Sequence, residues 1–136
     1  MREILFKAKR IDNGEWVEGY IIIYPSGKCE IHKKCIEPPD ILIKYDIDFE
    51  TICQYTGLTD RNDQKIWEND ICIIEDGTTF DDGDGYFEVG FDEDCARFTL
   101  DGDGLTVDFD NVYSNDTEVM GNIFDNPQLM EVAEYD

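Results

Sequence analysis

The residues best suited to bind a transition metal lie in one short segment, because the only histidine of the 136-residue chain stands between two cysteines. Cys29, His32 and Cys35 are each separated by two residues. A structural zinc site takes four ligands and usually contains close Cys-x₂-Cys pairs. If this segment is a strand, alternation places Cys29 and Cys35 on one face and His32 on the other. We therefore interpret the three as ordinary strand residues and predict no metal site.

Two aspartate–glycine stretches could supply oxygen ligands to a hard cation. Asp81–Gly85 reads DDGDG and Asp101–Gly104 reads DGDG. An EF-hand loop needs alternating Asp or Asn ligands, a glycine and a glutamate six residues later, and neither stretch meets this pattern. Asp-Gly pairs are also common in hairpin turns. We predict turns here, with at most weak and unspecific binding of divalent cations.

The residues offer little for catalysis. His32 is too close in sequence to Cys29 and Cys35 to form a convincing nucleophile–base pair with either. Paired aspartates could serve a metal-dependent nuclease, but such an enzyme also needs a basic track for its substrate. The sequence contains no Walker loop and no Rossmann glycine pattern. We predict no enzymatic activity, no catalytic residue and no cofactor.

The charge of the chain is large and uneven. The formal net charge is −22. Residues 1–45 carry eight Lys/Arg and seven Asp/Glu, whereas residues 46–136 carry three and twenty-six. The second part would repel a phosphate backbone, so direct binding of nucleic acid is not expected unless a cation bridges or the first part acts alone. Such asymmetry suits head-to-tail contacts between subunits, so we expect a homo-oligomer.

The composition points to a reducing compartment. Cysteines stand at positions 29, 35, 53, 72 and 95, an odd number with irregular spacing, so a complete disulfide framework is not expected. The chain has no apolar run of about 18 residues, and its first ten residues lack the apolar region of a secretory signal. We expect a cytoplasmic protein without membrane contact.

The elements that would position these residues are short strands. Apolar and polar side chains alternate over several segments separated by turn residues, which is typical of an all-β barrel or sandwich. We therefore predict a mainly β fold, with antiparallel strands forming a barrel-like or SH3-like core and little helix. Strands are expected over residues 2–9, 16–24, 29–35, 41–47, 66–74, 86–91, 95–100, 105–109 and 119–123.

Turn and helix signals complete this prediction. Asn13-Gly14 favours a tight hairpin turn. The segment DFETICQY could be a strand or a short helical turn capped by Asp48, and Gly57 is expected to end it. Pro127 fits the first position of a short C-terminal helix with Asn126 as its cap. We expect one domain over residues 1–136, with a division into two lobes, 1–45 and 46–136, as the alternative.

The stretch QYTGLTDRNDQKIWENDICII, from Gln54 to Ile74, looks like a sequence motif, but it contains no histidine, no nucleophile beside a base and no glycine-rich phosphate loop. Gly57 is expected to take a positive φ, and residues 60–63 to form a turn. Ile66, Ile71 and Ile73 are expected to face inward, and Asp70 to begin a buried strand whose apolar end indicates a central position. We interpret the stretch as a β-turn-β corner at the centre of the fold.

This stretch resembles the central motif of the YopX family, found in bacteriophages and integrated prophages. The opening REILFKAKRIDNGEWVEGY is similar to that family's N-terminal hairpin, and VMGNIFDNPQLM (Val119–Met130) resembles its closing motif. Asp63 and Asn69 depart from the pattern, because glycine is usual at both positions. The three motifs span both ends and the middle of the chain in the expected order.

The resemblance implies a mainly β, phage-encoded protein with a single YopX-like domain over residues 1–136, and it transfers no catalytic residue. We expect a non-enzymatic accessory protein that acts through protein–protein contacts or self-association, with a host or phage protein as a possible partner. The alternative is an acidic protein that imitates nucleic acid and inhibits a host DNA-binding protein. Mass spectrometry of proteins captured from a host lysate would distinguish these.

Overall fold

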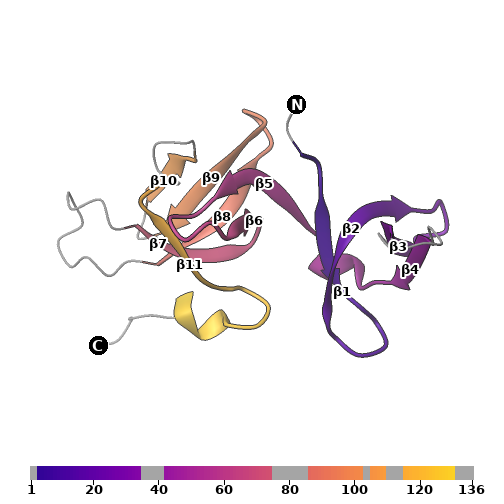
Figure 1. The fold of residues 1–136 in the computed structure, drawn as a ribbon. Helices are drawn as coiled ribbons and strands as arrows, with labels where there is room; N and C mark the ends of the chain where they lie inside the picture. The colour runs from indigo at the N-terminus through magenta and orange to yellow at the C-terminus, as the bar shows by residue number, and fades with distance from the viewer. Residues whose placement is uncertain (1–2, 35–41, 75–85, 103–104, 110–114, 131–136) are drawn as a thin grey trace. The chain divides into compact units, whose positions relative to one another are not determined.

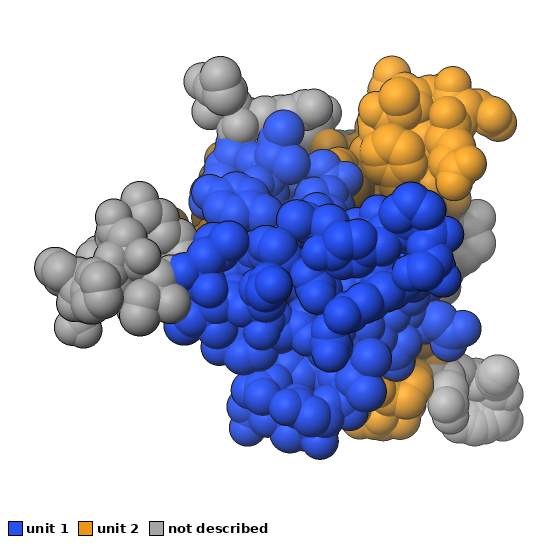
Figure 2. Space-filling model, turned by 90° about the vertical axis from the view of Figure 1, so that its right-hand side faces the viewer, with its two compact units in different colours: residues 1–55 blue, residues 56–136 orange. Residues whose placement is uncertain are grey.

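A computed structural model describes residues 3–34, 42–74, 86–102, 105–109 and 115–130 of the chain. It divides into two compact units, residues 1–55 and residues 56–136, which are drawn in separate colours in Figure 2. The division falls inside strand β5 (Cys53–Thr59), after the division between residues 45 and 46 that the sequence led us to consider. The reason is packing, because Ile47 is only 2% exposed and lies in the core of the first unit.

The first unit is an antiparallel sheet that curls over a small core (Figure 1). Its strand order is β4-β3-β2-β1, followed by the first residues of β5. A single bridge between Arg10 and Ile47 joins the end of the fourth strand back to the end of the first. The strands are β1 (Phe6–Lys9), β2 (Trp16–Ile23), β3 (Cys29–Lys34) and β4 (Leu42–Asp46).

Period-2 alternation explains which residues fill this core. Ala8, Cys29 and Ile31 come from inward-facing strand positions and are buried together with Ile47. Four partly buried hydrophobic side chains pack against them: Val17, Ile21, Tyr45 and Ile52.

The segment after β4 was predicted to be either a strand or a short helical turn, and it contains both, one after the other. Residues Phe49–Thr51 form a short 3-10 helix, η1, and the Asp48 carboxylate accepts a hydrogen bond from Glu50 N at 3.0 Å as its cap. Strand β5 then begins at Cys53 and continues beyond Gly57 to Thr59. The prediction that Gly57 ends its element was therefore wrong. Gly57 has the expected positive φ of 89°, which its missing Cβ permits within the strand.

The second unit contains a five-stranded antiparallel sheet with the order β10-β9-β8-β7-β11. Strand β6 lies beside β5. Strand β7 has a neighbour on both sides and is buried at four of its five residues, which confirms its predicted central position. The strands are β6 (Lys65–Trp67), β7 (Asp70–Ile74), β8 (Tyr86–Asp92), β9 (Arg97–Gly102), β10 (Leu105–Asp108) and β11 (Thr117–Asn122).

The second unit has its own core. Side chains from β6 to β9 and from the residue after β10 meet in it, while Leu58, Phe98, Val107 and Val119 pack at its margin. Its buried members are Ile66, Cys72, Ile74, Phe87, Val89, Leu100 and Phe109.

Two predicted strands have other bounds than their hydrophobic pattern suggested. Residues 66–74 form β6 and β7 instead of one strand, because Asn69 takes a φ of 75° and interrupts the extended backbone. Strand β9 begins at Arg97, since Ala96 has a φ of 56° and belongs to the preceding turn. Alternation alone does not reveal such left-handed residues.

The mainly β prediction is confirmed, and the described residues form open sheets without a closed barrel. The C-terminal element begins at Pro127 as predicted, but it is a 3-10 helix, η2 (Pro127–Met130). Asn126 directly precedes it; its side-chain oxygen accepts from Asn122 N at 3.2 Å, and its backbone oxygen accepts from Leu129 N at 3.1 Å. The rest of the predicted helix lies outside the described residues.

Candidate functional site

The corner in the signature stretch is built around a buried carboxylate. Asp60 is 4% exposed. Its Oδ1 accepts hydrogen bonds from the backbone N–H groups of Asn62 and Gln64, at 2.8 and 2.9 Å. Its Oδ2 accepts from Val119 N at 2.9 Å, on strand β11. One side chain therefore stabilises the turn and links it to strand β11, at a residue 59 positions later in the sequence. This is a structural role.

The rest of the signature is also structural. Asp63, which stands where glycine is usual, takes a left-handed geometry with a φ of 64°. Arg61 forms an ion pair with Glu118 on β11, and the Asp70 carboxylate accepts from Trp67 N at 2.9 Å. Asn69 N donates to Val89 O at 2.8 Å. These contacts support the interpretation of the stretch as a folding corner.

The closing motif forms a turn that side-chain hydrogen bonds stabilise. The Asn122 side-chain oxygen accepts from Phe124 N and Asp125 N, both at 2.9 Å. Gly121 leaves the space that this turn needs, since a Cβ there would lie 2.4 Å from the side-chain oxygen of Asn126. Hydrogen bonding and packing therefore account for the residues of the motif that resembles the family's closing sequence.

The histidine in the cysteine segment has a carboxylate neighbour, which the sequence reasoning missed. Glu30 is 6% exposed, and its Oε1 lies 2.9 Å from His32 Nε2. Tyr24 donates its hydroxyl to the same oxygen at 2.9 Å, and Lys28 Nζ lies 3.3 Å from Oε2. Hydrogen bonds from His32 and Tyr24 lower the pKa of Glu30 to about 2. A glutamate two positions before a histidine on a strand shares its face, and that signal was available.

The described part of this segment agrees with the predicted alternation. Cys29 lies in the core and contacts Gly27 O through its thiol at 3.5 Å, while His32 turns to Glu30 on the other face. Cys35 lies outside the described residues. Among the residues that the structure describes, no three His, Cys, Asp or Glu side chains gather as a metal site would require.

The acidic stretches are described only in part. Asp81–Gly85 and residues 103–104 lie outside the described residues. Asp101 stands directly opposite Glu88 across β8 and β9, and Thr99 Oγ1 donates to Asp101 at 3.3 Å. Burial, and after it the charge of Asp101, raises the pKa of Glu88. This is an unfavourable pair of like charges on a strand ladder.

Three of the four described cysteines are buried. Cys29, Cys53 and Cys72 are buried and Cys95 is exposed, and none of these four forms a disulfide. Burial raises the pKa of the Cys72 thiol, which suppresses the nucleophilic thiolate.

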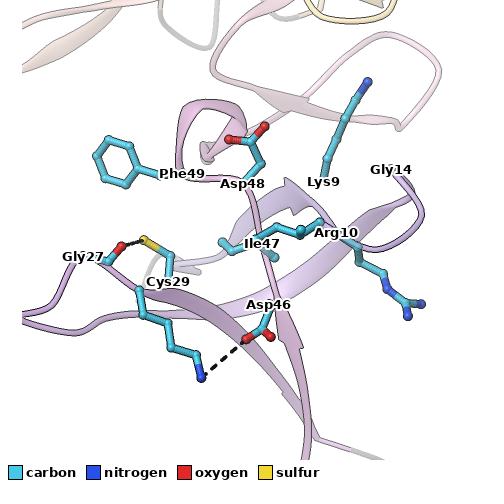
Figure 3. Close-up of a pocket in the computed structure, with 11 residues that line it drawn as sticks. Lys9, Arg10, Gly14, Gly27, Cys29, Asp46, Ile47, Asp48 and Phe49 are labelled. Atoms are coloured by element: carbon cyan, nitrogen blue, oxygen red, sulfur yellow. Dashed lines mark hydrogen bonds and ion pairs between the residues drawn. The ribbon is translucent and has the colours of Figure 1, made fainter.

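A pocket of about 740 Å³ opens on the first unit. Figure 3 shows Ile47 in the middle of it, with the Phe49 ring and the Lys9 side chain projecting in different directions. Cys29 and Ile47 supply buried apolar surface, whereas Phe49 and Ile11 are 60% and 68% exposed. An apolar hollow with exposed apolar residues around it is typical of a contact surface.

Cations surround this pocket but already have partners. Arg10 pairs with Asp12 at 2.6 Å, and its guanidinium lies 4.7 Å from the centre of the Tyr45 ring. The hydrogen bond to Asp12 raises the pKa of Arg10. Lys28 lies 3.8 Å from Asp46, a contact drawn in Figure 3. The lining therefore combines apolar surface with cations that are already paired at Arg10 and Lys28.

Comparison with known proteins gives the family and the fold. The family model described as YopX protein matches residues 6–131. The chain belongs to the YopX family. The YopX-like fold is also seen in the crystal structure of protein EF1440 from Enterococcus faecalis, with a TM-score of 0.64 and 22% identity, covering 96% of this chain and 100% of that one. A comparison with curated proteins gives no match. In the described part of this YopX chain, no helix is long and apolar enough to cross a membrane.

Proposed function

We propose that this YopX protein is a non-enzymatic accessory protein of a bacteriophage or prophage, acting in the host cytoplasm through protein–protein contacts and associating with itself. The phage setting is what the family resemblance implies. The contrast in charge and apolar exposure between the two units is the observation that carries the proposal.

The charge contrast follows the structural division. Residues 1–55 carry eight Lys/Arg and ten Asp/Glu, which gives −2. Residues 56–136 carry three and twenty-three, which gives −20. Identical acidic units repel each other, so contact between copies is more favourable when the near-neutral unit of one meets the acidic unit of another.

Apolar exposure shows the same contrast. Nine large hydrophobic side chains are exposed among the described residues, and seven of them belong to the first unit. Exposed apolar side chains around a hollow favour a protein partner over a soluble ion. The seven are Ile4, Ile11, Tyr20, Ile23, Tyr24, Leu42 and Phe49.

Light scattering after gel filtration, over a range of protein concentrations and salt concentrations, tests the proposal. We expect species larger than 15.7 kDa whose population depends on both variables, because charged contacts are screened by salt. A monomer that persists at high protein concentration and at every salt concentration would contradict self-association.

The charge of −20 on the second unit also favours a second candidate function, an acidic imitation of nucleic acid that occupies a host DNA-binding protein. Capture of partners from a host lysate followed by mass spectrometry separates the two. The imitation predicts basic, DNA-binding partners that high salt releases. Capture of the chain itself, without such partners, favours the first proposal.

A further inference from the structure

We propose that Asn13 is a site of spontaneous deamidation, in which its side-chain amide is converted to an aspartate or isoaspartate without an enzyme. Asn13 lies in the turn between β1 and β2 and is exposed, as is Gly14 after it. This inference does not depend on the proposed function, because it concerns the chemistry of the turn itself and not a partner.

The reaction takes place between two neighbouring groups of the chain. The backbone nitrogen of Gly14 attacks the side-chain carbonyl carbon of Asn13, a succinimide ring closes, and the amide nitrogen leaves as ammonia. The proton of the Gly14 nitrogen passes through water to the leaving group. Water then opens the ring at either of its carbonyl groups, which gives an aspartate or an isoaspartate. No atom is oxidised or reduced, so water is the only co-reactant.

The attacking nitrogen is accessible because a glycine carries it. A Cβ built on Gly14 would meet no atom within 4 Å, so the space beside the turn is open to water. Gly14 has a φ of 74°, which glycine adopts without a steric penalty. Neither a side chain nor packing therefore blocks the bend of the backbone that ring closure requires.

A hydrogen bond orients and activates the amide that is attacked. The Oδ1 atom of Asn13 accepts from the backbone N–H of Glu15 at 2.9 Å, a bond that holds the side chain over its own backbone. Negative charge develops on this oxygen when the nitrogen attacks the adjacent carbon. A backbone N–H aimed at such an oxygen stabilises that charge. The Glu15 donor therefore favours attack at Asn13.

A second hydrogen bond opposes the reaction and sets its rate. Gly14 N donates to Arg10 O at 3.0 Å, so the nitrogen has to leave this acceptor before it can lose its proton. The bond lies at the tip of the hairpin, beyond the bond from Arg10 N to Glu15 O at 2.9 Å. Exposed turns open more readily than the rest of a fold. The folded protein should therefore react, but more slowly than the unfolded chain.

Asn62 is a matched control within the same chain. It is also exposed in a turn, and the nitrogen after it also has an acceptor, since Asp63 N donates to Asp60 O at 3.0 Å. The difference is the residue that supplies the nitrogen. The side chain of Asp63 hinders the approach, and its carboxylate disfavours the deprotonated nitrogen that attacks. Asn62 should therefore keep its amide under conditions in which Asn13 loses it.

The product would change both the charge and the backbone of the turn. Its carboxylate would lie beside Asp12, which already pairs with Arg10 at 2.6 Å. An isoaspartate also carries the chain through the former side chain, which adds a carbon to the backbone before Gly14. The turn could then no longer close with the present bond from Gly14 N to Arg10 O. Gly14 borders the pocket of Figure 3, so the rim of that pocket would change as well.

Incubation of the full-length protein at mildly alkaline pH tests the proposal. Peptide mapping by mass spectrometry detects the change from amide to acid, and electron-transfer dissociation distinguishes isoaspartate from aspartate. Folded samples and samples unfolded in guanidinium chloride are followed in parallel. We expect product at Asn13 in both, formed faster in the unfolded chain, and none at Asn62 in the folded chain. A folded chain that keeps its Asn13 amide while the unfolded chain is converted would overturn the proposal, as would equal conversion at Asn13 and Asn62.

Two variants provide the second measurement. Asn13→Gln places the amide one carbon farther from the nitrogen, and Gly14→Ala puts a methyl group beside the nitrogen that attacks. Each should lose the product at position 13 over the same incubation. The unfolded samples of both variants are measured too, so the result holds even where a variant folds poorly. Product that forms in Gly14→Ala at the wild-type rate would overturn the role of the glycine.

Discussion

Glu30 is the residue on which the sequence and the structure differ most. The sequence drew attention to His32 because it is the only histidine, whereas the structure shows a buried carboxylate with three neighbours around it. Lys28 and Tyr24 belong to the turn between β2 and β3, so their approach depends on how the hairpin closes. Spacing predicted the shared face of residues 30 and 32 but not this closure.

Acid should destabilise the protein partly through Glu30. Its pKa is about 2 in the folded chain and 4.5 ordinarily, so its contribution to stability is complete above about pH 4.5 and disappears as the pH falls through 2. Glu30→Gln should therefore be less stable than the wild type at pH 7, and the difference should shrink towards pH 2. Urea denaturation at several pH values measures this. A gap that is constant with pH would contradict the carboxylate's role.

Glu88 should behave in the opposite way. Its pKa is raised, so the charged form is disfavoured in the folded state, and stability is lost as the pH rises from 4.5 through the raised pKa. Glu88→Gln should stabilise the protein at pH 7 by about 0.2–1 kcal/mol, the usual cost of like charges facing each other on a ladder. The gain should vanish near pH 4, and a gain that persists there would contradict this explanation.

At the scale of elements, the corner in residues 54–74 was predicted in part. Gly57 takes the predicted positive φ, and Asp70 begins the buried strand. The contact from Asp60 to Val119 could not be predicted, because no periodic pattern relates residues so far apart. The break at Asn69 was missed although a signal was present, since asparagine tolerates a left-handed backbone and glycine is usual at this position of the family pattern.

Removing the Asp60 carboxylate should destabilise the second unit. Asp60→Ala would leave three backbone N–H groups without their acceptor, and a buried unsatisfied donor costs about 1–3 kcal/mol. We expect a loss of at least about 2 kcal/mol in the free energy of unfolding, measured in urea.

Asp63→Gly is the matched comparison in the same turn. Asp63 is exposed and holds a φ of 64°, a geometry that glycine adopts without a steric penalty. Its replacement should change stability by no more than about 1 kcal/mol, in the stabilising direction. If both variants were equally destabilised, the turn as a whole and not the Asp60 carboxylate would be responsible.

At the scale of the whole molecule, the sequence predicted the class of fold and the unequal charge. It could not fix where the two units divide, because the division falls inside β5 and depends on which core Ile47 joins. The hollows on the first unit could not be predicted from the sequence either. They depend on how exposed side chains such as Phe49 and Tyr20 stand around them, and a sequence pattern does not specify this.

Salt should stabilise the two units unequally. Screening relieves self-repulsion in the unit of charge −20 and has little to relieve in the unit of charge −2. The two tryptophans allow each unit to be followed alone, since Trp16 belongs to the first and Trp67 to the second. In Trp16→Phe the remaining Trp67 reports the second unit, and in Trp67→Phe the remaining Trp16 reports the first. The urea concentration at the midpoint of unfolding should therefore rise more steeply with NaCl concentration for Trp16→Phe. An equal rise in both variants would show that the units unfold together.

Strand β5 has a consequence for dissecting the protein. It hydrogen-bonds to β1 through its first residues, and Thr56 Oγ1 donates to Ile66 O from its second half, so no linker separates the units. A gene cut between codons 55 and 56 would give two fragments that each end in half a strand. Separately expressed, they should be poorly soluble; mixed, they should restore a complex in gel filtration, as split reporter proteins do.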